Sequence, residues 1–146
     1  TERIMRSDPP TEAEIEIATD YVAERMADVE KIVPIDKAVT FVGCAGTFTT
    51  LSALAQGMER YDADSIHGSE LRFDALRVLT RQLIGMWAGE RSLNPVIHPG
   101  RADVIGGGSV AVEGIMTMIE RNSDARSFFI SEKDILDGII AGLAAG

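Results

Sequence analysis

Residues 39–51 read Val39-Thr40-Phe41-Val42-Gly43-Cys44-Ala45-Gly46-Thr47-Phe48-Thr49-Thr50-Leu51. An apolar, β-branched run ends in a turn with two glycines, and a helical pattern follows at once. Gly43 and Gly46 can adopt backbone angles closed to other residues and let a ligand approach the main chain. The free N–H groups of the following helix favour an anion such as phosphate. The alternative is an ordinary strand-to-helix turn, with Thr47 as N-cap and no ligand.

The composition is that of a globular protein with one domain over residues 1–146 and 45% hydrophobic residues. Fourteen Lys and Arg against 23 Asp and Glu give a net charge of -9. Such a charge argues against general binding to nucleic acid or to anionic membranes, but it leaves room for a local basic pocket. The sequence shows neither a membrane span nor a signal peptide at its start, so we expect a cytoplasmic protein.

Cys44 is the only cysteine, which excludes an internal disulfide. Its neighbours are small or apolar, and no base is nearby in the sequence. This pattern predicts a buried structural thiol rather than a nucleophile.

The apolar spacing predicts an α/β fold. Thr11 and Glu14 form a capping box that opens a helix, and Pro34 closes that segment. Two strands are expected, at residues 37–42 and 127–130, the first buried on both faces as in a parallel sheet. Further helices are expected at 47–57, 73–87 and 101–121, with a last one capped by residues 131–134. Two strands make a thin sheet, so the pattern indicates either a piece of a larger molecule or an unrecognised strand.

Three consecutive glycines, Gly106 to Gly108, fall inside the helix expected at 101–121. Each should cost about 1 kcal/mol relative to alanine in a helix interior. Close packing against the sheet or against a ligand would explain them, and so would a break in the helix.

The chain offers few candidates for catalysis. His67 and His98 do not lie at metal-ligand spacing from another His or Cys, and no serine elbow, zinc-protease motif or P-loop occurs. Asp134 and Asp137 are explained by a helix cap and a solvated face. We therefore predict no catalytic residue and no metal ligand within the chain.

A second informative cluster reads His98-Pro99-Gly100-Arg101-Ala102-Asp103. Pro99 suits the first positions of a helix, so Arg101 would project from its first turn. A cation there opposes the helix dipole and needs a partner. That partner could be Asp103 or another carboxylate, or it could be a ligand phosphate, which the guanidinium fork can hold through two bonds.

Taken together, these segments resemble the exopolyphosphatase/guanosine pentaphosphatase (Ppx/GppA) phosphatase family. The resemblance spans nearly the whole chain and rests on the glycine turn of residues 43–54, the 98–105 cluster, and the stretches Ser7 to Pro10, Tyr61 to Gly68 and Ser131 to Gly138.

The resemblance implies an actin-like ATPase fold made of two ribonuclease-H-like domains around a cleft. This chain would be the second domain, a small sheet packed with several helices, and the first domain would be absent. The implied chemistry is hydrolysis of terminal phosphate from inorganic polyphosphate or guanosine pentaphosphate with Mg²⁺. In the family the catalytic glutamate and the two phosphate loops belong to the first domain, so this chain alone is expected to be inactive. The run from Gly106 to Ser109 lacks the adjoining Asp and leading strand of such a loop.

On this interpretation the domain forms one wall of the substrate cleft, and its implied partner is the first domain of the same protein. A homodimer is a further candidate. The substrate-binding residues expected are Gly43, Gly46, Thr47, Thr49, His98 and Arg101. The alternative is a non-catalytic module for binding phosphate or nucleotide, or for dimerisation.

Overall fold

A three-stranded sheet with strand order β1-β3-β2 organises the computed structural model, which describes residues 3–145. Strands β1 (Val42–Cys44) and β3 (Ser127–Ser131) run parallel, and β2 (Glu70–Arg72) pairs antiparallel with β3. The expected α/β fold, a small sheet packed with several helices, is confirmed. The suspicion of an unrecognised strand was correct. β2 is only three residues long, too short for an alternating pattern to be visible.

The first strand lies later in the chain than its composition predicts. Residues Ile35–Lys37 form a 3₁₀ helix, and the ladder with β3 begins only at Val42, which lies opposite Phe129. Burial on both faces was also wrong. Gly43 is buried, whereas Val42 and Cys44 on the opposite face are exposed. The thiol of Cys44 is therefore exposed, against expectation, because the strand points it to the uncovered face.

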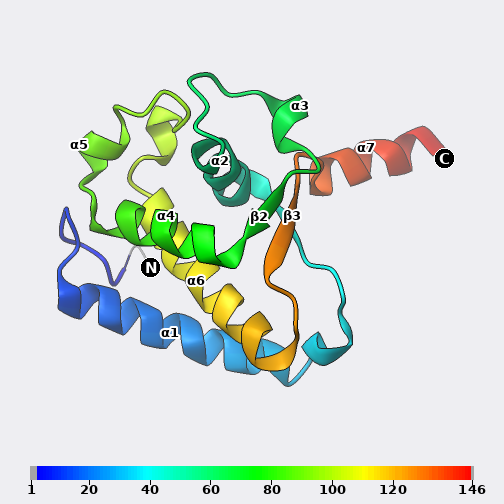
Figure 1. Ribbon diagram of the computed structural model, residues 1–146, viewed down its shortest axis with the longest axis horizontal. Coiled ribbons are helices and arrows are strands. Elements are labelled where there is room, and N and C mark those ends of the chain that lie inside the picture. The colour runs from blue at the N-terminus through cyan, green and yellow to red at the C-terminus, as the bar shows by residue number, and fades with distance from the viewer. Residues whose placement is uncertain (1–2, 146) are drawn as a thin grey trace.

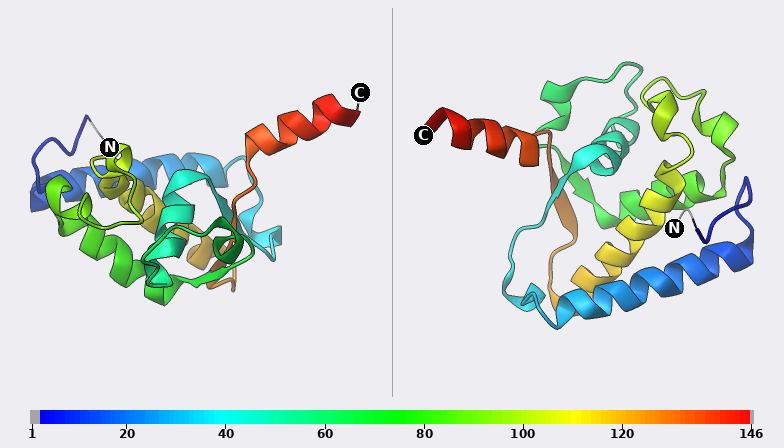
Figure 2. Two further views of the ribbon diagram at one scale, coloured as in Figure 1. Left: turned by 90° about the horizontal axis from the view of Figure 1, so that it is seen from above. Right: turned by 180° about the vertical axis from the view of Figure 1, so that it is seen from behind.

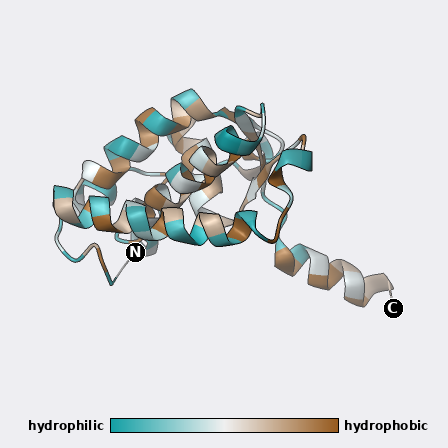
Figure 3. Ribbon diagram, turned by 90° about the horizontal axis from the view of Figure 1, so that it is seen from below, coloured by the Kyte–Doolittle hydropathy of each residue, from teal (hydrophilic) through white to brown (hydrophobic). Residues whose placement is uncertain are grey.

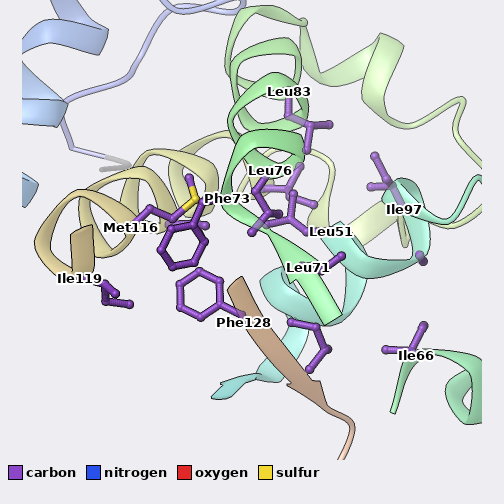
Figure 4. Packing of buried hydrophobic residues seen from close by; sticks show 14 of the residues in the cluster. Leu51, Ile66, Leu71, Phe73, Leu76, Leu83, Ile97, Met116, Ile119 and Phe128 are labelled. Atoms are coloured by element: carbon purple, nitrogen blue, oxygen red, sulfur yellow. The ribbon is translucent and has the colours of Figure 1, made fainter. Parts of the chain in front are cut away.

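Helices cover the other face of the sheet (Figures 1 and 2). They are α2 (Ala45–Ala55), α4 (Phe73–Gly85) and α6 (Ile105–Asn122), and α1 (Glu12–Glu30) packs along α6. Phe128 of β3 contacts Phe73 and Phe48, with ring centroids 4.8 and 5.0 Å apart. Figure 4 shows the rings of Phe73 and Phe128 near Met116, with Leu51 of α2 and Leu76 of α4 in the same cluster. Burial of these apolar side chains drives the packing of the helices on the sheet.

Sequence signals located most helix ends well. The capping box of Thr11 and Glu14 is present at α1, and Asp134 accepts from the main-chain N–H of Leu136 at the start of α7 (Ile135–Ala145). The helix expected at 73–87 ends at Gly85, and α5 (Ala88–Arg91) follows. The link at 59–69 contains the short α3 (Ala63–Ile66).

The helix expected at 101–121 is two elements. Pro99–Arg101 form a 3₁₀ helix, and α6 starts only at Ile105, so Arg101 does not lie in the first turn of α6. The three glycines fall in that first turn and do not break the helix. Among the described residues, no helix combines the length and apolar character that crossing a membrane requires.

Candidate phosphate-binding site

The turn between β1 and α2 has an unusual backbone conformation and no side-chain cap. Ala45, directly after the strand, has φ +66°, a left-handed conformation that is uncommon outside glycine. The N-cap position belongs to Cys44, which makes no side-chain capping bond, so the alternative interpretation with Thr47 as N-cap is wrong in that respect. The first turn of α2 carries no acidic residue either. Side chains of this turn therefore leave the positive end of the α2 dipole without a counter-charge.

Gly43 has a packing role in this turn. A β-carbon at residue 43 would lie 2.4 Å from the ring of Phe48, so only glycine lets that ring pack over the strand. The Phe48 ring in turn meets Phe128 edge-on. The side of Gly43 on which a Cβ would stand thus faces the core.

Gly46 makes room for an arginine. A β-carbon there would lie 2.7 Å from both Cζ and Nη1 of Arg101, so the guanidinium lies directly against the first turn of α2. The backbone at Gly46 is not left-handed, since the positive φ of this turn belongs to Ala45. The absent side chain, rather than an unusual φ, is therefore what this position requires.

Arg101 brings a positive charge to a helix end that is already positive. Among the described residues, no carboxylate forms an ion pair with it, and Asp103 lines a different hollow. A hollow of about 220 Å³ opens beside the guanidinium, lined by Gly46, Thr47, Arg101, Val104 and Ile105. An exposed guanidinium beside an uncapped helix N-terminus is an arrangement suited to an anion.

The two threonines of the turn differ in their surroundings. Thr47 lines the hollow and packs on α6, because a β-carbon at Gly108 would lie 2.6 Å from its Oγ1. Thr49 is buried, and its hydroxyl donates to the carbonyl of Gly46 at 3.4 Å. Thr47 therefore faces the candidate site, whereas Thr49 supports the turn from within.

Tyr61 and Glu132 belong to this region, although sequence analysis assigned them no role. The hydroxyl of Tyr61 donates to Oε1 of Glu132 in a short hydrogen bond. Burial and this carboxylate raise the pKa of Tyr61 above its usual value. A hydrogen bond with Thr49 and the nearby charge of Arg101 offset only part of that rise. The main-chain N–H of Glu132 also donates to Nδ1 of His67 at 3.2 Å. Both residues lie in stretches that carry the family resemblance, which was the one signal that could have found them.

His98 caps the 3₁₀ helix that carries Arg101. Its Nδ1 accepts a hydrogen bond from the main-chain N–H of Gly100 at 3.1 Å. The histidine therefore shapes the turn from which the guanidinium projects, and its ring is exposed.

A second hollow, of about 270 Å³, lies on the other side of the start of α6. Its floor is Arg91, which is 4% exposed and donates to the carbonyls of Ala102, Leu83 and Met86 at 2.6, 2.8 and 2.9 Å. Burial lowers the pKa of Arg91, and the charges of Asp8 and Asp103 offset only part of that decrease. Arg6 and Arg91 are thus matched by two carboxylates around this hollow.

The same arginine accounts for part of the glycine run. A β-carbon at Gly106 would lie 2.7 Å from Nη1 of Arg91, and Gly108 packs on Thr47. Of the two explanations offered for the glycines, close packing holds and a helix break does not, although the neighbours are Arg91 and α2 rather than the sheet or a ligand.

Metal ligands do not gather in the described part of the chain. No three His, Cys, Asp or Glu side chains lie together as a metal site between residues 3 and 145. We therefore assign no metal ligand among these residues.

Comparison with known proteins shows the family of the chain. The model of the Ppx/GppA phosphatase family matches residues 1–142. The chain belongs to this family. It is 46% identical over 144 residues to Exopolyphosphatase 2 of Mycobacterium tuberculosis, covering 99% of this chain and 45% of that protein.

Solved structures of Ppx/GppA proteins show the same fold. The crystal structure of an exopolyphosphatase-like protein matches 99% of this chain and 47% of its own chain, with a TM-score of 0.94 and 34% identity. The Aquifex aeolicus family member matches with a TM-score of 0.86 and 25% identity, again over 99% of this chain and 45% of its own. This chain therefore spans about half the length of these Ppx/GppA relatives.

Proposed function

We propose that this chain forms one wall of the substrate cleft in an exopolyphosphatase-type phosphoanhydride hydrolase. The substrate would be inorganic polyphosphate or guanosine pentaphosphate, whose terminal phosphate is released by water. Family membership and the likeness to Exopolyphosphatase 2 support this proposal.

The observation that carries the proposal is the guanidinium of Arg101 lying against Gly46 at the uncapped start of α2. Two positive groups that converge without a carboxylate repel each other until an anion lies between them. A phosphate oxygen would accept from the N–H groups of the turn and from the guanidinium at the same time. Such charge-assisted bonds are about twice as strong as neutral ones.

Each residue has a limited part in this proposal. Arg101 and the main-chain N–H groups at the start of α2 bind and orient the phosphate, Thr47 offers a hydroxyl at the hollow, and His98 holds the turn that carries Arg101. The carboxylate that activates water, and the Mg²⁺ that neutralises developing charge, would come from the rest of the protein.

Phosphate release from polyphosphate tests the proposal. The full-length protein with Mg²⁺ should release phosphate, whereas the 146-residue chain should match the blank while still binding tripolyphosphate. Arg101→Ala should weaken that binding, and Arg81→Ala, which removes an exposed arginine of α4, serves as the matched control. Binding without hydrolysis by the full-length protein would instead favour a non-catalytic phosphate-binding module. Failure of both chains to bind tripolyphosphate would reject the site.

A further inference from the structure

One carboxylate, that of Glu132, lies at the candidate phosphate site without forming an ion pair with Arg101. Ser131 is the register partner of Cys44, so Glu132 follows β3 at the edge of the sheet where α2 begins. It lies in the bend that leads to α7, the helix that projects from the body of the molecule (Figure 3). An uncapped helix start and an exposed guanidinium both attract a carboxylate at this edge. Some other contact therefore holds the side chain of Glu132.

Tyr61 supplies that contact. Its hydroxyl donates to Oε1 of Glu132, which is 71 positions away in the sequence. Burial raises the pKa of Tyr61, and Arg101 lies near enough for its charge to offset part of that rise. The tyrosine, the carboxylate and the guanidinium are therefore neighbours at one edge of the site.

The link that carries this tyrosine, residues 59–69, is anchored to the elements on either side of it. The hydroxyl of Ser69 shares a hydrogen bond of 2.8 Å with the hydroxyl of Ser52 in α2. The main-chain N–H of Glu132 donates to Nδ1 of His67 in the same link at 3.2 Å. Figures 1 and 2 show α3, which belongs to this link, beside the start of α7. The hydroxyl and the carboxylate are thus held together by the backbones that carry them.

A second carboxylate of the link is also engaged. Asp62 caps α3, where its Oδ1 accepts from the main-chain N–H of Asp64 at 3.2 Å and its Oδ2 accepts from the hydroxyl of Ser65 at 2.6 Å. Two acidic groups of these segments are thus bonded to neighbours, and the guanidinium of Arg101 stays available to an anion from outside the chain.

We propose that Tyr61 is a positioning residue that keeps the carboxylate of Glu132 off Arg101 and thereby keeps the anion site open. Without the tyrosine hydroxyl, Oε1 of Glu132 would lose its donor, and the N–H groups and charge of Arg101 would attract it. The resulting ion pair would compete with a phosphate for the same donors. The proposal rests on the phosphate-binding part that the proposed function gives to Arg101, and it adds the residue that keeps Arg101 free for this part.

Reaction of Arg101 with phenylglyoxal, located by mass spectrometry, tests the proposal without a phosphate ligand. In the full-length protein, Tyr61→Phe should slow this reaction about threefold, the effect of an exposed ion pair. The double variant Tyr61→Phe, Glu132→Gln should react as fast as the wild type. Tyr21→Phe is the matched control, because it removes the hydroxyl of the other tyrosine of the chain, on α1, and should leave the rate unchanged. Unfolding would speed the reaction, so a slower one cannot arise from a loss of fold.

Calorimetric titration of the same full-length variants with tripolyphosphate measures the effect on binding. Tyr61→Phe should weaken binding about threefold, whereas Glu132→Gln alone should strengthen it, because a negative charge leaves the edge of the site. The double variant should bind as tightly as Glu132→Gln, since the tyrosine acts only through the carboxylate. A merely structural tyrosine would instead lower the affinity equally in both backgrounds.

An unchanged rate of Arg101 modification in Tyr61→Phe would overturn the proposal, and so would a slower rate that Glu132→Gln does not restore. Equal losses of affinity with and without the Glu132 carboxylate would overturn it as well. Failure of the wild-type protein to bind tripolyphosphate would reject the proposed function, whereas the modification rates, which need no ligand, decide the role of Tyr61 by themselves.

Discussion

Two arginines of this molecule lie on glycines in the first turns of helices, and their surroundings are opposite. Arg91 lies on Gly106 of α6, is buried, and donates to three main-chain carbonyls. Arg101 lies on Gly46 of α2, is exposed, and has no carboxylate partner among the described residues. The same local arrangement thus supports a structural role in one place and a binding role in the other. Whether the hydrogen bonds of a guanidinium are already satisfied separates the two.

Replacement of Arg91 should have the largest effect on stability. Arg91→Ala removes the donors to Ala102, Leu83 and Met86 and leaves a cavity beneath α6, so we expect a loss of about 3 kcal/mol in the free energy of unfolding. Urea unfolding measures it, with the exposed Arg81→Ala as control, which should stay within about 0.5 kcal/mol. A loss as small as that of the control would mean that Arg91 is not structural.

Replacement of Arg101 should affect binding rather than stability. In the full-length protein, Arg101→Ala should raise the KM for polyphosphate by a factor that corresponds to about 1.5–3 kcal/mol. Arg101→Lys should raise it less, because lysine keeps the charge but loses the two-pronged hydrogen bonding of the guanidinium. The unfolding free energy should change by no more than about 0.5 kcal/mol in either variant. Loss of stability in both variants without a change in KM would place Arg101 with Arg91 as part of the scaffold.

Adding one methyl group at Gly106 or at Gly46 tests the same difference between the two arginines. Gly106→Ala would push a β-carbon against a buried guanidinium that cannot move away, and should cost about 1–2 kcal/mol of stability. Gly46→Ala meets an exposed guanidinium that can swing out, so stability should change by less than about 0.5 kcal/mol. Because the displaced Arg101 then leaves the hollow, tripolyphosphate affinity should fall. Thermal unfolding and calorimetric titration of both variants measure these effects, and similar losses of stability in both would remove the distinction.

The smallest effect concerns Glu14, which accepts from Arg6 and Ser7 in the wall of the Arg91 hollow. Hydrogen bonds from the main-chain N–H groups of Thr11, Arg6 and Ser7 lower the pKa of Glu14 from 4.5 to about 2. Since the folded pKa is depressed, this stabilisation is complete above about pH 4.5 and is lost as the pH falls towards 2. Glu14→Gln should therefore flatten the pH dependence of stability in that window without changing tripolyphosphate affinity at pH 7. An unchanged pH profile would contradict this role.

Local signals predicted the elements whose ends are defined by side chains. The capping box of α1 and the acidic cap of α7 are bonds between neighbours in sequence, so they form wherever those residues occur. The strand ends, the short β2 and the exposure of Cys44 were missed, because pairing with β3 determines them. In the site, Arg101 and Gly46 were recognised separately, but their contact joins residues 55 positions apart, as the numbering shows.

The sequence by itself determined the α/β class, the caps of α1 and α7, the family resemblance and the pair of segments that carry the candidate site. Tertiary structure alone decided which arginine is buried, why the glycine run is tolerated, and which face of the sheet stays uncovered. The physical reason is that caps and periodicity depend on neighbours within one turn of helix. Whether a guanidinium has a structural or a binding role depends instead on whether carbonyls or solvent surround it in the folded chain. The carbonyls of Leu83, in α4, and of Ala102, just before α6, come together around Arg91 only after α4 and α6 have packed against each other.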